Sequence, residues 1–153
     1  MVKFLGGVNG YLLDTNLLIA LLWPSHEQHG VAVKWFARRR RAGWATSPIT
    51  EAGFVRIVSN PAFSRDAVQP REAVQVLSAN TAAADHLFWT DELPVQQAVA
   101  FAGLRLVGHQ QVTDAYLLGL ALERGGVLAT LDRGVAALCD ATGPARKAVE
   151  CVA

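Results

Sequence analysis

The chain has 153 residues, a length that accommodates one ordinary domain with a single sizeable core. It is 52% hydrophobic and only 18% charged, which excludes an intrinsically disordered chain. The formal net charge of +1 indicates neither a strongly basic nucleic-acid binder nor an acidic protein, so any attraction to RNA must come from local patches. No repeat, low-complexity tract or linker interrupts the sequence, and we therefore expect one domain over residues 1–153.

The cysteines and the most apolar stretch bear on where the protein works. Cys139 and Cys151 do not have the spacing of a zinc site and do not make a disulfide framework, so a reduced, cytoplasmic protein is the simplest interpretation. Residues 11–23 are too few to span a bilayer and include Asp14 and Asn16. We expect no targeting segment and no membrane span.

The first half of the chain alternates short apolar runs with amphipathic segments. A buried strand is expected to end at Asp14, and Ser47-Pro48 resembles an N-cap followed by proline at the first helical position. The elements expected here are, in chain order, a strand over 11–13, helices over 16–22 and 26–41, a strand over 44–46, and helices over 49–59 and 70–79.

The second half continues the same alternation. An apolar helix stops at Gly125-Gly126, and the strand that follows it is ended by Asp132. The expected elements are a helix over 94–102, a third strand over 104–107, a helix over 112–124, a fourth strand over 127–131 and a fifth over 148–152. Strands that alternate with helices predict an α/β fold, with a mainly parallel sheet of about five strands covered on both faces.

Four acidic residues stand where ligands bind in such sheets. Asp14 and Asp132 directly follow apolar strands, and Glu51 and Asp114 lie in the first turn of helices that start at the same edge. The topology therefore predicts that four carboxylates from distant parts of the chain converge there. Each also has a simpler interpretation: Asp14 could cap a helix, Glu51 and Asp114 could complement helix dipoles, and Asp132 could be a turn residue.

Clustered carboxylates need compensation, because two unit charges about 4 Å apart repel by roughly 4 kcal/mol at an effective dielectric of 20. Oxygen ligands without His or Cys suit Mg²⁺ or Mn²⁺. Such cations neutralise charge on a phosphodiester during hydrolysis. The residues alone thus indicate metal-assisted phosphodiester chemistry.

Four segments in order resemble the acidic motifs of PIN-domain nucleases, and more closely those of the VapC-type ribonuclease toxins of bacterial toxin–antitoxin pairs. The segments are Leu13-Asp14-Thr15-Asn16-Leu17-Leu18, Ser47-Pro48-Ile49-Thr50-Glu51, Val112-Thr113-Asp114-Ala115-Tyr116-Leu117 and Leu128-Ala129-Thr130-Leu131-Asp132-Arg133-Gly134. They extend over about residues 11–135, and no acidic position departs from the family pattern.

The resemblance implies a PIN-like three-layer α/β/α sandwich and an intact site for Mg²⁺ or Mn²⁺. Asp14 and Asp114 would be the most direct metal ligands, and Glu51 and Asp132 would complete the site. It also implies an RNA substrate, a cognate antitoxin that blocks the site, and a homodimer.

Three further residues are candidates for supporting roles. Thr130 precedes Asp132 by two residues and so points to the same face of a strand, where it could bond a carboxylate or simply be a β-branched strand residue. Asn16 could act in the same way or be an N-cap. Arg133 could position RNA or pair with an acid, whereas His109 is a lone loop histidine, a type that more often has no catalytic role.

Two rival functions make different demands on the sequence. Phosphoryl transfer through an aspartyl-phosphate on Asp14 needs a lysine late in the chain, and the only candidate, Lys147, follows no apolar strand. A catalytically silent module that binds RNA or a protein would be expected to lack an acidic residue, and none is missing.

Overall fold

The computed structural model describes residues 7–152, which fold around one five-stranded sheet in which every pairing is parallel. The strand order is β3-β2-β1-β4-β5. The strands are β1 (Tyr11–Leu13), β2 (Trp44–Thr46), β3 (His86–Phe88), β4 (Val127–Thr130) and β5 (Val149–Cys151). The predicted parallel sheet of about five strands is confirmed.

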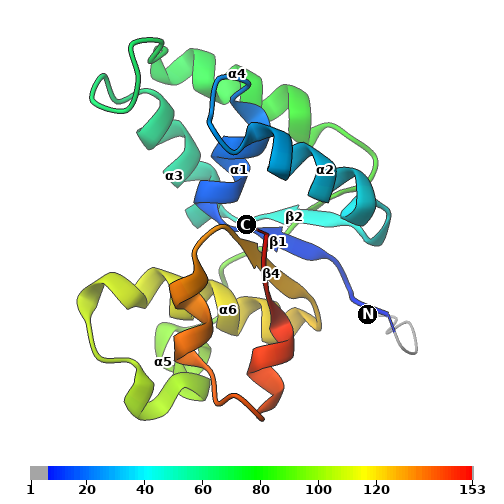
Figure 1. Cartoon of the computed structure of the whole chain (residues 1–153), viewed down its shortest axis with the longest axis vertical. Helices are drawn as coiled ribbons and strands as arrows, with labels where there is room; N and C mark the ends of the chain where they lie inside the picture. The colour runs from blue at the N-terminus through cyan, green and yellow to red at the C-terminus, as the bar shows by residue number, and fades with distance from the viewer. Residues whose placement is uncertain (1–6, 153) are drawn as a thin grey trace.

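Helices cover both faces of this sheet (Figure 1). One layer contains α1 (Thr15–Leu22), α2 (His29–Arg39), α3 (Pro48–Val58) and α4 (Pro70–Thr81). The other contains α5 (Val95–Ala98) and α6 (Val112–Arg124). Short 3₁₀ helices complete the chain: η1 (Arg40–Ala42), η2 (Ala100–Arg105), η3 (His109–Gln111), η4 (Arg133–Leu138) and η5 (Pro144–Ala148). The expected three-layer α/β/α arrangement is confirmed.

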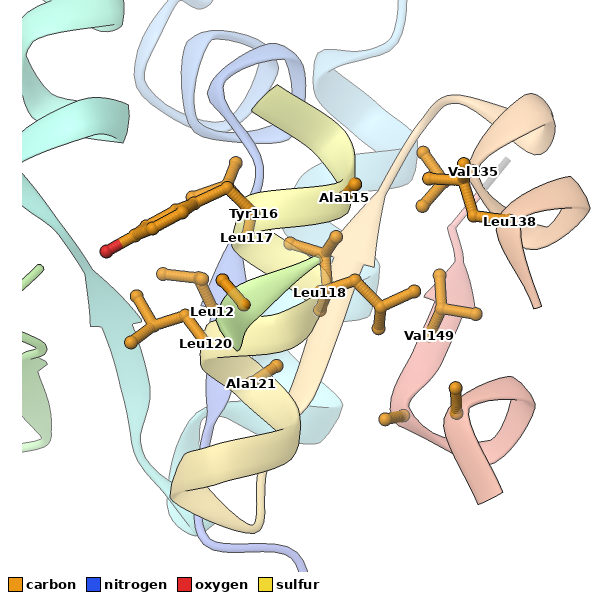
Figure 2. Packing of buried hydrophobic residues seen from close by; sticks show 14 of the residues in the cluster. Leu12, Ala115, Tyr116, Leu117, Leu118, Leu120, Ala121, Val135, Leu138 and Val149 are labelled. Atoms are coloured by element: carbon orange, nitrogen blue, oxygen red, sulfur yellow. The ribbon is translucent and has the colours of Figure 1, made fainter. Parts of the chain in front are cut away.

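The central strands β1 and β4 are buried on both faces, which explains their continuous apolar sequence. Alternation sends Leu12 into the core on the α6 side and Leu13 into the core under α1–α4. Figure 2 shows the α6-side core, where Leu118 and Leu120 of α6 pack with Leu12 and with Val149 of β5. These two cores hold the carboxyl ends of β1 and β4 in fixed positions.

The prediction of a third strand over residues 104–107 is wrong. Residues 104–107 are the end of η2 and a loop, in which Leu104 is 99% exposed and Val107 is 85% exposed. Gly103 bends the backbone just before residues 104–107. Its φ of 53° is one that residues with a Cβ atom rarely adopt. The third strand is β3, residues 86–88, which pairs with β2 at the edge of the sheet.

The start of α3 follows its sequence signal. Ser47 is the N-cap, Pro48 is the first helical residue, and Thr50 completes a capping box with Ser47, so the predicted cap is confirmed. Two other predicted helices are shorter than expected: α2 begins at His29, and α5 is a single turn followed by η2.

Among residues 7–152, no helix combines the length and the apolar character that crossing a membrane requires.

Candidate active site

Asp14 lies directly after β1, in the centre of the sheet's carboxyl edge. Its backbone N–H donates to the carbonyl of Ala129 (2.9 Å), which extends the pairing with β4 by one residue. Its Oδ1 accepts a hydrogen bond from the backbone N–H of Thr15 (2.8 Å) at the start of α1. The helix-cap interpretation of Asp14 therefore holds alongside any catalytic role.

Thr130, the last residue of β4, fixes the other oxygen of Asp14. Its hydroxyl donates to Asp14 Oδ2 (2.7 Å) and accepts from the backbone N–H of Asp132 (3.0 Å). Asn16 Oδ1 accepts from the backbone N–H of Leu131 (3.2 Å). Thr130 and Asn16 thus tie the start of α1 to the end of β4, and Thr130 contacts a carboxylate directly.

Asp14, Asp114 and Asp132 share one electrostatic environment. Burial, together with the negative charges of Asp14 and Asp132, raises the pKa of Asp114 to about 6. Burial also raises the pKa of Asp14, against the hydrogen bonds from Thr130 and Thr15, and the charge of Asp132 adds to the rise. The structure therefore brings these three predicted residues together.

Asp132 and its neighbour Arg133 are more exposed to solvent than Asp14. Asp132 is exposed, and its Oδ1 accepts from the backbone N–H of Gly134 (2.7 Å), so it also caps η4. Arg133 is exposed at the start of η4. A basic side chain consequently stands beside the acidic group and in contact with solvent.

Glu51 has different partners from the three aspartates. Its Oε2 accepts a hydrogen bond from the hydroxyl of Thr46 (2.6 Å), and Thr46 Oγ1 lies 2.7 Å from His86 Nε2. Thr46 points to the same face of the sheet as Trp44, which belongs to the α1–α4 core, whereas Thr130 points to the same face as Leu128, which belongs to the other core. The hydrogen bond to Thr46 therefore directs Glu51 toward the α1–α4 face.

The four carboxylates do not form one compact ligand set. Within the described range 7–152, no three Asp, Glu, His or Cys side chains lie close enough together to hold a metal ion. The participation of Glu51, and full convergence of the four acids, stay predictions.

Thr46, which ends β2, and His86, which begins β3, are polar residues near Glu51 that the sequence analysis did not select. Thr46 is completely buried, and burial lowers the pKa of His86, against the charges of Glu51 and Asp85. The available signal for His86 was its place before the apolar pair Leu87-Phe88, which indicates a strand beginning at that histidine.

Comparison with known families decides what kind of domain this is. The family model described as "PIN domain" matches residues 11–141. The chain belongs to the PIN-domain family. The range contains all four acidic residues and every element from β1 to η4.

The curated relatives of this PIN domain include ribonucleases of Mycobacterium tuberculosis. Ribonuclease VapC39 is 46% identical over 127 residues, which cover 82% of this chain and 90% of that protein. Ribonuclease VapC38 is 45% identical over 125 residues, covering 81% of this chain and 86% of the relative. Ribonuclease VapC29 is 41% identical over 130 residues, with coverages of 83% and 89%. The VapC resemblance is confirmed.

The aspartates of this PIN domain have the donor chemistry, though not the compact arrangement, of a site for a hard divalent cation. Asp14, Asp114 and Asp132 offer oxygen donors alone, the type that Mg²⁺ and Mn²⁺ prefer. The raised pKa values of Asp14 and Asp114 show that their ionised forms are disfavoured by burial and by mutual repulsion. A cation among them would relieve that repulsion, so we regard these three residues as the best candidates to hold it.

The raised pKa of Asp114 predicts a measurable effect on stability. The pKa is 3.8 for the ordinary group and about 6 in the folded chain, so folding is favoured by protonation. The free energy of unfolding therefore falls as pH rises from about 4 to about 6, and the penalty is fully present above that range. It amounts to at most about 3 kcal/mol, and to about 2 kcal/mol once solvent screening of this half-buried group is included.

Asp114→Asn is accordingly expected to stabilise the metal-free protein by about 2 kcal/mol at pH 7.5, and not at pH 4. Urea denaturation in EDTA at both pH values measures the difference. Asp66→Asn, at an exposed position, is the matched control and should leave stability unchanged at either pH. Equal stability of the wild type and Asp114→Asn at pH 7.5 would contradict the assigned environment of Asp114.

Proposed function

We propose that this chain is a Mg²⁺- or Mn²⁺-dependent endoribonuclease, the toxin of a type II toxin–antitoxin pair. The observation that carries the proposal is the electrostatic coupling of Asp14, Asp114 and Asp132 at the carboxyl edge of the sheet. The identity to proteins named ribonucleases, extending over 80% of the chain and more, supports RNA as the substrate.

The residues of the site would have different roles in phosphodiester hydrolysis. Thr130 and the N–H of Thr15 each hold one oxygen of Asp14, so its carboxylate is already oriented. A divalent cation bound by Asp14 and Asp114 would supply positive charge that stabilises the phosphodiester's transition state. Asp132 adds an exposed carboxylate beside that pair, and Arg133 is placed to bind an RNA phosphate.

A partner protein and a second copy of the chain complete the proposal. Exposed apolar side chains, among them Phe88 (51% exposed), Leu104 (99%) and Val107 (85%), provide surface that another chain could cover. The antitoxin would occupy the site and prevent RNA from entering. A cytoplasmic location, where cellular RNA is available, also remains a prediction.

Removing the divalent cation is expected to abolish RNA cleavage. The purified chain is mixed with a fluorescent RNA, and cleavage is followed as Mg²⁺ or Mn²⁺ is titrated and then chelated with excess EDTA. Because the aspartates repel one another and the cation would supply the charge that stabilises the transition state, cleavage should fall to background in EDTA and return on adding Mn²⁺.

The same titration separates the rival functions. Cleavage that continues in excess EDTA would overturn the metal-dependent mechanism. RNA binding without cleavage at any metal concentration would indicate a silent binding module. Transfer of a phosphoryl group to Asp14, without cleavage, would indicate phosphotransfer.

A further inference from the structure

A pocket of about 390 Å³ opens beside the first turn of α6. Three residues of α6 line this α6 pocket, namely Val112, Thr113 and Tyr116. Its other walls are Ile49, near the start of α3, and residues 91–95, which lead into α5. The volume lies within the range of sites that bind small molecules or single chemical groups.

Contacts within the protein hold the walls of the α6 pocket together. The hydroxyl of the buried Tyr116 donates to the carbonyl of Leu93 (2.9 Å), which attaches the loop before α5 to α6. Further along α6, Gly119 leaves room for the backbone of Ala98 in α5 to pack closely. Figure 2 shows the Tyr116 ring on the side of α6 away from Val135. The pocket is therefore formed before a ligand enters, which lowers the entropic cost of binding.

Most of the wall of the α6 pocket is apolar. Val95 and Val112 stand at its opening, 54% and 42% exposed, and Pro94 and the Tyr116 ring continue the apolar surface. Proteins that recognise single-stranded RNA pack unstacked bases against apolar and aromatic side chains of this kind. The pocket thus suits a flat ring better than a charged phosphate.

Two carboxylates of the α6 pocket, those of Asp91 and Glu92, restrict which ring fits best. Both residues are exposed, so they meet solvent or a ligand. Burial, and next the negative charge of Asp91, raise the pKa of Tyr116, so this carboxylate acts on the tyrosine of the pocket wall. An ionised carboxylate only accepts hydrogen bonds, and at base edges it accepts from an amino group. Adenine, cytosine and guanine carry an amino group, whereas uracil does not.

The order of the strands places the α6 pocket and Arg133 on opposite sides of the aspartate group. Ile49 follows β2 and residues 91–95 follow β3, whereas Arg133 follows β4. Asp14 follows β1, which lies between β2 and β4. RNA phosphates are attracted by the guanidinium of Arg133 and repelled by the two carboxylates of the pocket. An RNA strand whose backbone runs past Arg133 would therefore turn a base, not a phosphate, toward the pocket.

We propose that the α6 pocket binds one unpaired base with an amino group (adenine, cytosine or guanine) beside the RNA bond that is cleaved. The inference rests on the proposed function and names a specificity-determining site for it. Val95, Asp91 and Glu92 contact that base in the bound state. They therefore determine which RNA is cut, whereas the aspartate group performs the cleavage.

An apolar side chain of a partner protein would be a different occupant. Filling the pocket would then weaken association with that protein, while the base preference of RNA cleavage would not change. The position beside the aspartates, past which the RNA strand must run, favours the base. Base preference is therefore the deciding measurement.

The experiment uses the full chain in Mn²⁺ and a pool of single-stranded RNA with randomised sequence. Sequencing the 5′ ends of the products gives the base preference at each position around the cleaved bond. An RNA chosen from the pool, and its copy with uracil at the preferred position, then give kcat and KM. Val95→Trp fills the opening of the pocket, and Asp91→Asn combined with Glu92→Gln removes the two charges with little change of shape. Circular dichroism checks the folding of each variant.

We expect the wild type to prefer a base with an amino group over uracil by about 10-fold or more at one position beside the cleaved bond. Val95→Trp should raise KM for the preferred RNA by about 10-fold or more with little change in kcat, because base binding is lost and the aspartates are untouched. Asp91→Asn with Glu92→Gln should remove most of the preference over uracil, because an amide can also donate to a uracil carbonyl.

Two matched controls lie outside the α6 pocket. Val74→Trp changes another helical valine, in α4, that is 50% exposed. Glu27→Gln removes the charge of another exposed glutamate. Both variants should keep the wild-type KM and the wild-type base preference.

The failures of the two proposals are distinguishable. If the wild type neither cleaves RNA in Mn²⁺ nor binds it in Ca²⁺, both are overturned. If it binds RNA without cleaving it, the proposed function is wrong, and the effect of Val95→Trp on that affinity decides for or against the pocket.

Other outcomes concern the pocket alone. RNA cleavage without the base preference, or unchanged KM and preference in folded Val95→Trp, overturns only the base-binding role. Weaker self-association of Val95→Trp by light scattering, with unchanged base preference, would overturn it in favour of a protein ligand. Should Val95→Trp fail to fold, Asp91→Asn with Glu92→Gln decides by the base preference.

Discussion

Asp14→Asn is expected to lower kcat/KM for metal-dependent RNA cleavage by more than about 100-fold, because residues that only support a metal ligand already account for about 10–100-fold. Asparagine has nearly the same shape, and its amide oxygen can still accept the hydrogen bond from Thr15, so the start of α1 should persist. What the substitution removes is the negative charge, at a position that is 6% exposed and central to the three coupled aspartates.

The measurement is the steady-state rate on a fluorescent RNA at saturating Mn²⁺, with RNA affinity determined separately in Ca²⁺. RNA affinity should be retained or increased, since a negative charge near the phosphates has been removed. Asp66→Asn, which also replaces an aspartate but at an exposed position, is the control and should cleave at the wild-type rate. Wild-type cleavage by Asp14→Asn would show that Asp14 does not belong to the catalytic site.

The centre of the sheet was predictable because its local signals and its tertiary environment agree. β1 and β4 are buried on both faces, so their sequences are mainly apolar, and an aspartate follows each of them within two residues. The hydrogen bond from Thr130 to Asp14 followed the same logic, since Thr130 ends a strand adjacent to β1. The sequence predicted that both strands end at the same edge, whereas the pairing of β4 with β1 that joins these two residues, 116 positions apart, comes from the fold.

The edge of the sheet was not predictable in the same way. β3 has exposed Leu87 and Phe88 and carries no buried apolar run, while residues 104–107 contain three apolar residues without being a strand. An edge strand is determined by the neighbour that it pairs with, and that contact does not appear in its own sequence. His86 was missed for this reason.

The orientation of Glu51 is a second property that the sequence could not supply. The sequence predicted that Glu51 lies in the first turn of α3, because Ser47, four residues earlier, is the N-cap of that helix. The partner of its carboxylate, however, depends on the rotamer and on Thr46 and His86 from two strands. Sequence motifs therefore located the acidic residues, whereas only the fold shows which carboxylates share one environment.

Gly119→Ala is expected to destabilise the protein by about 3 kcal/mol or more, which corresponds to a fall in melting temperature of roughly 6–12 °C for a chain of this size. Gly119 lies in the buried part of α6, where a Cβ would be 1.8 Å from the carbonyl oxygen of Ala98 in α5. The obstacle is backbone, so it cannot move aside by changing a rotamer. The two helices would have to separate, and the core on the α6 side would lose packing around Leu118 and Leu120.

Gly30→Ala tests whether this cost comes from the contact and not from the substitution itself. Gly30 is also helical, in α2, but a Cβ there would meet no atom within 4 Å. Because alanine has the higher helix propensity, Gly30→Ala should stabilise the protein by up to about 1 kcal/mol. In thermal denaturation, the melting temperatures of the two variants should therefore shift in opposite directions from that of the wild type. If Gly119→Ala were as stable as the wild type, α5 could not lie against α6 as closely as the structure places it.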